Sequence, residues 1–132
     1  MEFESYDRRH LEGVLDICLE EGWQSYTTDP DRTHRALTAP GVTTIVATEG
    51  GDVCGFSQAQ SDGEIQAHLS VLAVKKAFRR QGIGQKLIEK SFQEAGGTRI
   101  DLITDDAQGF YQSMAHSVKL GFRLYPDAEP TD

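Results

Sequence analysis

The stretch that most constrains this 132-residue chain runs from His68 to Lys90, HLSVLAVKKAFRRQGIGQKLIEK. It predicts a strand ending at Val74, a tight turn holding Gly82 and Gly84, and then an amphipathic helix. A strand, a glycine turn and a helix start together direct free backbone N–H groups and the positive end of a helix toward a phosphate. The stretch therefore predicts an α/β fold with an anion site at the start of the helix.

The distribution of charge supports a bound polyphosphate. Residues 75–90 contain six basic residues and one acidic residue, Glu89, so the local charge is +5. The net charge of the chain is −8, which leaves −13 for the remainder. Positive side chains at a helix start oppose the helix dipole and are mildly destabilising unless an anion is present. The alternative is an ordinary solvated, basic helix start whose glycines serve only a tight turn.

Spacing separates three kinds of phosphate-binding turn. A Walker loop ends in Gly-Lys-Ser/Thr, but Gly84 is followed by Gln85 and Lys86. A dinucleotide fingerprint needs a small residue where this chain has Leu87. The remaining pattern, Arg79-x-x-Gly82-x-Gly84 after a strand, resembles the GNAT superfamily of acetyl-CoA-dependent N-acyltransferases.

The resemblance implies where acetyl-CoA, the cosubstrate, is bound. In the family the glycine turn wraps the coenzyme A pyrophosphate, and the preceding strand offers backbone groups to the pantetheine arm. The residues that match these parts are Leu72, Ala73, Val74, Arg79, Arg80, Gln81, Gly82, Ile83, Gly84 and Gln85.

The rest of the chain predicts a single domain over residues 1–132 with a mixed α/β sheet and helices on both faces, as in the family. Turn residues and β-branched runs predict an antiparallel meander, followed by a strand–helix–strand unit whose two strands pair in parallel. The predicted strands are 2–6, 42–48, 53–60, 64–74 and 98–103. The predicted helices begin near 7, 29, 82 and 105, with Leu11, Val14, Leu15, Cys18 and Leu19 on the apolar side of the first.

The C-terminal part departs from the family pattern. The segment 106–111 resembles the last helix of the family, and Gly121-Phe122 resembles the strand start that follows it. Nine residues separate Tyr111 from Gly121, more than the family's usual few, and ten follow Phe122, so the last strand is expected to be missing. Residues 126–132 are interpreted as a frayed tail.

Acetyl transfer to an amine requires a base and an acid. An alkylamine with a pKa near 10.4 must lose a proton before it attacks, which costs roughly 4 kcal/mol at pH 7. Tyr111 matches the family tyrosine near the coenzyme sulfur and is the candidate acid; a half-buried core aromatic is the alternative. His68 and Ser70 are the candidate base and proton relay, because alternation places Gln66, His68, Ser70 and Leu72 on one face of the strand.

The string from Ala67 to Arg79 is particularly similar to arylalkylamine N-acetyltransferases, which carry a His-x-His pair and use it as a water-linked base. Ser70 replaces the second histidine of that pair. A structural histidine that bridges strand and helix remains the alternative for His68. Carboxylates are reserve bases, with surface charge as the competing interpretation: Glu20, Glu64, Asp105 and Asp106.

Other residues carry weaker signals. Cys18 and Cys54 lie in apolar contexts and are interpreted as buried free thiols, so Cys54 is a poor candidate for an acyl carrier. The four histidines lack metal-ligand spacing, and no metal site is predicted. Trp23 and Tyr26 line an acceptor pocket or fill the core; the sequence leaves both interpretations open.

The hypothesis drawn from the sequence is an N-acetyltransferase that transfers an acetyl group directly from acetyl-CoA to a primary amine, on a small molecule or a peptide. No apolar run reaches the length of a membrane span and the N-terminus lacks a signal pattern, so a cytoplasmic protein is expected. An acidic chain is a poor general nucleic-acid binder, so no nucleic-acid or membrane partner is expected, and the charge favours a cationic acceptor. The alternatives are a non-catalytic acyl-CoA-binding module or sensor, and a homodimer whose partner completes the sheet.

Overall fold

The computed structural model describes residues 1–127 and divides the chain into two compact units, Met1–Leu102 and Ile103–Asp132. The first unit contains the whole sheet. The second contains one short helix and is described by itself.

The sheet has five strands in sequence order, β1-β2-β3-β4-β5. They are β1 (Glu2–Ser5), β2 (Val42–Glu49), β3 (Asp52–Ser61), β4 (Gln66–Val74) and β5 (Arg99–Asp101). The first four strands pair antiparallel, and β5 pairs in parallel with β4. The predicted meander and the parallel strand–helix–strand unit are therefore confirmed.

Residues 1–127 also form five α-helices and two 3-10 turns. They are η1 (Arg8–His10), α1 (Leu11–Glu21), α2 (Gln24–Thr27), α3 (Pro30–Leu37), η2 (Lys76–Phe78), α4 (Ile83–Ala95) and, in the second unit, α5 (Gln108–Gln112). Asp29 caps α3 by accepting the backbone N–H of Arg32, as the Asp-Pro pair predicts.

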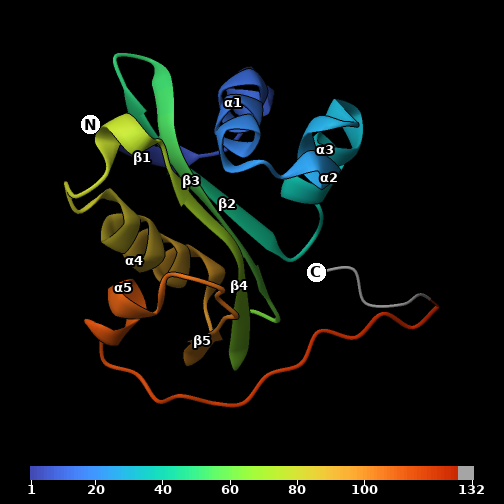
Figure 1. Cartoon of the computed structure of the whole chain (residues 1–132), viewed down its shortest axis with the longest axis vertical. Coiled ribbons are helices and arrows are strands. Elements are labelled where there is room, and N and C mark those ends of the chain that lie inside the picture. The colour runs from blue at the N-terminus through green and yellow to red at the C-terminus, as the bar shows by residue number, and fades with distance from the viewer. Residues whose placement is uncertain (128–132) are drawn as a thin grey trace. The chain divides into compact units, whose positions relative to one another are not determined.

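Two cores lie on opposite faces of the sheet. Figure 1 shows α1, α2 and α3 on one side of the strands and α4 on the other. Val14, Ile17 and Phe56 belong to the core beneath α1, whereas Ile45 and Leu87 belong to the core beneath α4. The prediction of helices on both faces is confirmed.

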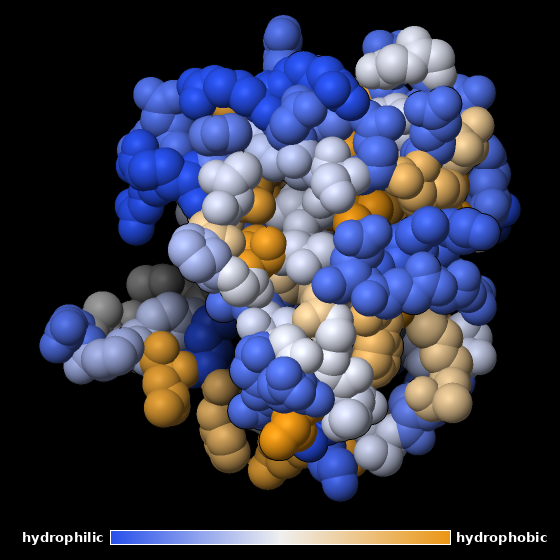
Figure 2. All heavy atoms as spheres, turned by 180° about the vertical axis from the view of Figure 1, so that it is seen from behind, coloured by the Kyte–Doolittle hydropathy of each residue, from blue (hydrophilic) through white to orange (hydrophobic). Residues whose placement is uncertain are grey.

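The register of α1 differs in part from the prediction. Leu19, placed on the apolar side from its spacing, is 69% exposed, whereas Ile17 is fully buried. The buried residues of α1 are Leu11, Val14, Ile17 and Cys18, and the rotation per residue of an α-helix places Leu19 on the other side of the helix from this stripe, where it faces solvent. Hydrophilic side chains gather over the end of the molecule that carries α1 to α3, as the view from behind in Figure 2 shows.

Strand β4 begins two residues later than predicted, at Gln66 rather than Glu64. Oδ1 of Asp62 accepts the backbone N–H groups of Glu64, Ile65 and Gln66 at 2.8, 2.8 and 3.3 Å. A side chain that satisfies these donors replaces the start of the ladder with a turn.

The predicted strand start at Gly121-Phe122 is wrong for the described residues, since residues 115–125 form no helix or strand. The homodimer hypothesis assumed an open edge strand near residues 121–125, and these residues form no strand. The interpretation of residues 126–132 as a tail falls mostly on residues 128–132, outside the described range. Among residues 1–127, no helix is long and apolar enough to cross a membrane.

Candidate active site

The turn between β4 and α4 has the conformation that the glycine spacing predicts. Gly82 precedes the helix at φ 80°, and Arg80 has a positive φ of 64°. No side chain caps the start of α4, and the first backbone bond of the helix runs from Lys86 N–H to Gly82 O. The first N–H groups of the helix are thus left for an anion, with the positive end of the helix dipole behind them.

The side chain of Arg79, unlike those of the other cations of residues 75–90, makes hydrogen bonds and an ion pair within the described residues. Its Nε donates to the carbonyl of Val74 at 3.0 Å, and its Nη2 pairs with Oε1 of Glu21 on α1. Nearby, the backbone N–H of Lys76 donates to Oε1 of Glu20 at 2.9 Å. The acidic end of α1 therefore fixes the connection between β4 and α4, a link that the sequence pattern did not suggest. Glu20, a reserve base in the sequence, serves this link.

The remaining cations of residues 75–90 make no ion pair within the described residues. They are Lys75, Lys76, Arg80, Lys86 and Lys90. Lys76, Arg80 and Lys86 are exposed, and Lys75 and Lys90 are half-buried. Cations left unpaired in a chain of net charge −8 are available to an anionic ligand.

Strand β4 has an open edge next to this turn. Its parallel pairing with β5 ends at His68 and Asp101. The N–H of Lys75 donates to Cys54 O on β3, and backbone groups of successive strand residues point to opposite edges. The backbone groups of Leu72 and Val74 therefore point away from β3, toward the side where β5 has ended. The resemblance of the sequence to the GNAT superfamily predicts that the pantetheine arm is bound at these two residues.

A β-bulge in β4 changes which way its side chains point. Gln58 pairs with Val71 and Ala59 pairs with Leu69, so Ser70 is an extra residue in β4. A bulge re-aims the side chains on one side of it.

The bulge places the two candidate catalytic side chains on the face that carries α3. Nε2 of Gln58 donates to the carbonyl of Ala36 in α3 at 3.2 Å, and Gln60 lies two residues further along the same face. Gln60 is the cross-strand partner of His68, and its Nε2 donates to Oγ of Ser70 at 2.8 Å. His68 and Ser70 therefore do share one face.

The prediction that Leu72 shares this face is wrong. Leu72 packs with the core beneath α4, on the opposite side of the sheet. Strict alternation holds only where the ladder has no extra residue, and Ser70 is one. His68 itself is exposed and is paired in register with Asp101 on its other side.

Tyr111 lies on α5, in the second unit. Its ring meets that of Phe110 edge-on, with centroids 5.0 Å apart. Burial raises the pKa of the Tyr111 phenol, so the hydroxyl keeps its proton at neutral pH. A protonated phenol suits the role of acid, and that role stays a prediction.

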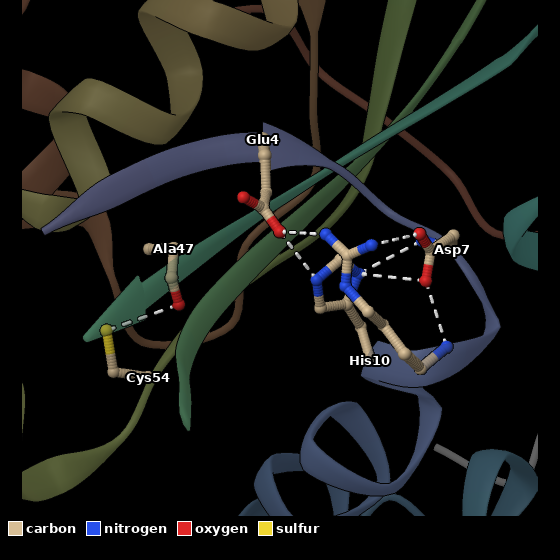
Figure 3. A network of polar contacts seen from close by, with 6 residues as sticks. Glu4, Asp7, His10, Ala47 and Cys54 are labelled. Atoms are coloured by element: carbon tan, nitrogen blue, oxygen red, sulfur yellow. Dashed lines mark hydrogen bonds and ion pairs between the residues drawn. The ribbon is translucent and has the colours of Figure 1, made fainter. Parts of the chain in front are cut away.

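The surroundings of the other candidate residues favour structural roles or surface positions over catalysis. Cys54 is fully buried, its Sγ lies 3.3 Å from the carbonyl of Ala47 (Figure 3), and burial raises the pKa of its thiol. A buried thiol with a raised pKa is a poor nucleophile. Trp23 and Tyr26 pack against the core beneath α1, which favours the core interpretation. Glu64, Asp105 and Asp106 are exposed.

The sequence pattern missed a polar network around His10. His10 is 3% exposed; its Nδ1 accepts the N–H of Asp7 at 3.0 Å, so Nε2 carries the proton and donates to Glu4 at 2.8 Å (Figure 3). Arg9 and then His10 hold the pKa of Glu4 below its ordinary value. The capping box formed by Asp7 and His10 joins β1 to α1. The three-residue spacing of Asp7 and His10, which is that of a capping box, is the feature of the sequence from which this network could have been predicted.

Comparisons with known proteins agree with this geometry. The family profile described as an acetyltransferase (GNAT) domain matches residues 40–115, which is more than half of the chain. This chain belongs to the GNAT acetyltransferase family. The matched range covers β4, the glycine turn, α4 and α5.

Solved GNAT structures have the same fold. A GNAT-family acetyltransferase from Streptococcus pneumoniae superposes with a TM-score of 0.78 at 22% identity, covering 96% of this chain and 98% of that one. An aminoglycoside acetyltransferase from an uncultured soil metagenomic sample gives 0.74 at 20% identity, covering 97% and 100%. An aminoglycoside N-acetyltransferase in complex with CoA gives 0.72 at 16% identity, covering 95% and 94%. Among curated proteins, no sequence matches this chain.

Proposed function

We propose that this protein is an acetyl-CoA-dependent N-acetyltransferase that acetylates a primary amine. The main observation behind this proposal is that the open edge of β4 leads directly into the glycine turn. The start of α4 after this turn has no side-chain cap, and unpaired cations lie in the same segment. Peptide groups along an extended arm and positive charge at a diphosphate are what coenzyme A requires. A GNAT structure containing CoA adds support for this class of cosubstrate.

The residues would divide the binding as follows. The N–H groups at the start of α4, with Arg80 and Lys86, hold the diphosphate. Leu72 and Val74 hold the pantetheine arm through their backbone groups. Arg79 holds the turn itself through Val74 and Glu21, so its contribution to binding is indirect.

Acetyl-CoA supplies an acetyl thioester. The amine nitrogen attacks the thioester carbonyl carbon, the new C–N bond forms, and the C–S bond breaks. His68, directly or through a water held by Ser70, takes the proton that the amine loses, and Tyr111 donates a proton to the departing thiolate. The products are an N-acetylamine and the free thiol of coenzyme A, and transfer of the proton from His68 back to Tyr111 through water restores both side chains.

A coupled experiment tests this function. Calorimetric titration with acetyl-CoA measures binding, and a thiol-release assay over a panel of primary amines measures transfer. Saturable binding together with amine-dependent thiol release supports the proposal. Binding without release from any amine favours the non-catalytic acyl-CoA module instead, and absence of binding contradicts both.

The Tyr111→Phe variant tests whether Tyr111 acts as the acid without contributing to the binding of acetyl-CoA. We expect lower turnover with nearly unchanged affinity for acetyl-CoA, because the substitution removes only the phenol hydroxyl group. Unchanged turnover would remove Tyr111 from the mechanism.

A further inference from the structure

An open cavity of about 550 Å³ lies in the first unit, at the start of β4. It is formed by the turn before β2, the turn between β3 and β4, the first residues of β4, and the end of β5. The residues that line it are Pro40, Gly41, Val42, Gln60, Ser61, Asp62, Gln66, Ala67, His68 and Asp101. A cavity of this volume is within the range that holds small organic ligands.

The cavity contains the candidate base. Gln60, His68 and Asp101 are consecutive cross-strand partners on β3, β4 and β5, and such partners share a face of the sheet. Neighbouring strands lie roughly 4.8 Å apart, so the three side chains form a row on the floor of the cavity. An acceptor in this cavity therefore lies against His68, at the point where β4 and β5 stop pairing and the open edge begins.

The lining is negatively charged. It contains the two carboxylates Asp62 and Asp101 and no lysine or arginine. The backbone N–H groups of Ile65 and Glu64 hold the pKa of Asp62 below its ordinary value, so this carboxylate stays ionised at neutral pH. The backbone N–H groups of the turn donate to Oδ1 of Asp62, and no hydrogen bond within residues 1–127 uses Oδ2. Nε of Arg99 lies 3.7 Å from Oδ2 of Asp101, so the guanidinium group offsets part of the negative charge of this carboxylate.

We infer that this cavity is the acceptor site and that it selects an acceptor with a second cationic group besides the amine that reacts. The inference rests on the proposed function. The reacting amine must be neutral when it attacks, so it gains little from a carboxylate. A second ammonium group keeps its charge throughout and is bound by Asp62 and Asp101, which orients the neutral amine toward His68. The substrate class is a small diamine or polyamine.

Matched acceptors test the inference. Cadaverine and 5-aminopentanol have the same chain length and one identical amine, but the second end is an ammonium in one and a hydroxyl in the other. We expect kcat/KM for cadaverine to exceed that for 5-aminopentanol by about tenfold or more, as one charge-assisted contact predicts. The ratio should fall as salt is added, because the carboxylates are partly exposed.

Two variants test whether Asp62 and Asp101 are responsible for the preference for cadaverine over 5-aminopentanol. Asp62→Asn keeps the Oδ1 acceptor of its turn and Asp101→Asn keeps its size, so both are expected to fold. Each should lower the cadaverine to 5-aminopentanol ratio severalfold without changing the affinity for acetyl-CoA. Asp16→Asn makes the same charge change on an exposed position of α1 and should leave the ratio unchanged.

The outcomes separate the two proposals. Acetylation of both acceptors at a ratio near one, or a ratio that the Asp62 and Asp101 variants leave unchanged, overturns the acceptor-site inference while the proposed function stands. Acetylation of no amine in the panel overturns both.

Discussion

A single extra residue determines where the proposed base points. If Ser70 were paired in the β3–β4 ladder like its neighbours, strict alternation would continue from Leu72, and His68 would lie on the α4 side. Because Ser70 is left out of the pairing, His68 lies on the α3 side, beside Gln60 and Asp101. The orientation of His68 is therefore a property of the pairing between two strands, not of His68 and its neighbours in sequence.

Replacing His68 with Gln should lower kcat for amine acetylation by about 100-fold or more, the usual contribution of a general base. Acetyl-CoA affinity should not change, because no backbone group is lost. Steady-state kinetics and calorimetry measure the two quantities, with His116→Gln, an exposed histidine of the second unit, as the control. Equal kcat in the His68 variant and the control would mean that another group takes the proton.

Cys18 gives a prediction of pH dependence. Burial raises the pKa of its thiol from 9.0 to about 11. The folded state therefore holds this proton more tightly than the unfolded state, and the stabilisation present below pH 9 is lost as pH rises toward 11. Two pH units at roughly 1.36 kcal/mol each make the full loss about 3 kcal/mol. Urea unfolding from pH 8 to 11 should show a shallower decline for Cys18→Ala than for the parent; parallel curves would contradict the assignment.

At the scale of elements, α4 must be held firmly for its N-terminus to bind an anion. Oγ of Ser57 on β3 and Oγ of Ser91 on α4 lie 2.6 Å apart, and both side chains are fully buried. This pair fixes the helix on the sheet at a point where neither hydroxyl has access to water. The apolar contacts of Ile83 and Leu87 act beside it.

Ser57→Ala or Ser91→Ala alone should destabilise the fold by about 1–3 kcal/mol, because the remaining hydroxyl is left buried without a partner. The double variant should cost less than the sum of the two, since no orphaned group remains. Chemical denaturation of the four proteins measures the coupling. Additive losses would show that the two hydroxyls do not depend on each other.

The sequence was sufficient for the order and type of the main elements. Periodicity, the Asp29-Pro30 cap and the glycine pairs at 50–51 and 96–97 are local signals, and the meander, α4 and the parallel β5 follow from them. The glycine turn was predictable for the same reason, because its function depends on backbone conformation within a few residues.

What the sequence could not supply depends on contacts between distant residues. The bulge at Ser70 is visible only once β3 is paired with β4. The engagement of Arg79 by Glu21 joins residues 58 positions apart. The row formed by Gln60, His68 and Asp101 requires the register of three strands, and the cavity above it requires their ends to lie together. These are the features from which the acceptor site is inferred.

At the scale of the whole molecule, the account depends on an uneven distribution of charge. Within the described residues of this chain of net charge −8, Lys75, Lys76, Arg80 and Lys86 stay unpaired in the segment that leads into the first turn of α4, and carboxylates lie at the other end of β4. An anionic cosubstrate and a cationic acceptor would thus approach opposite ends of β4. Both attractions should weaken with added salt.

Titration calorimetry with acetyl-CoA on the parent protein, Arg80→Gln and Arg35→Gln decides whether the glycine turn binds a diphosphate. Arg35 is an exposed cation of α3 and controls for net charge. The account predicts saturable binding that Arg80→Gln weakens about tenfold, the value of one charge-assisted contact, and that Arg35→Gln leaves nearly unchanged. No binding at millimolar acetyl-CoA, or equal weakening by the two substitutions, would contradict a diphosphate site at the glycine turn.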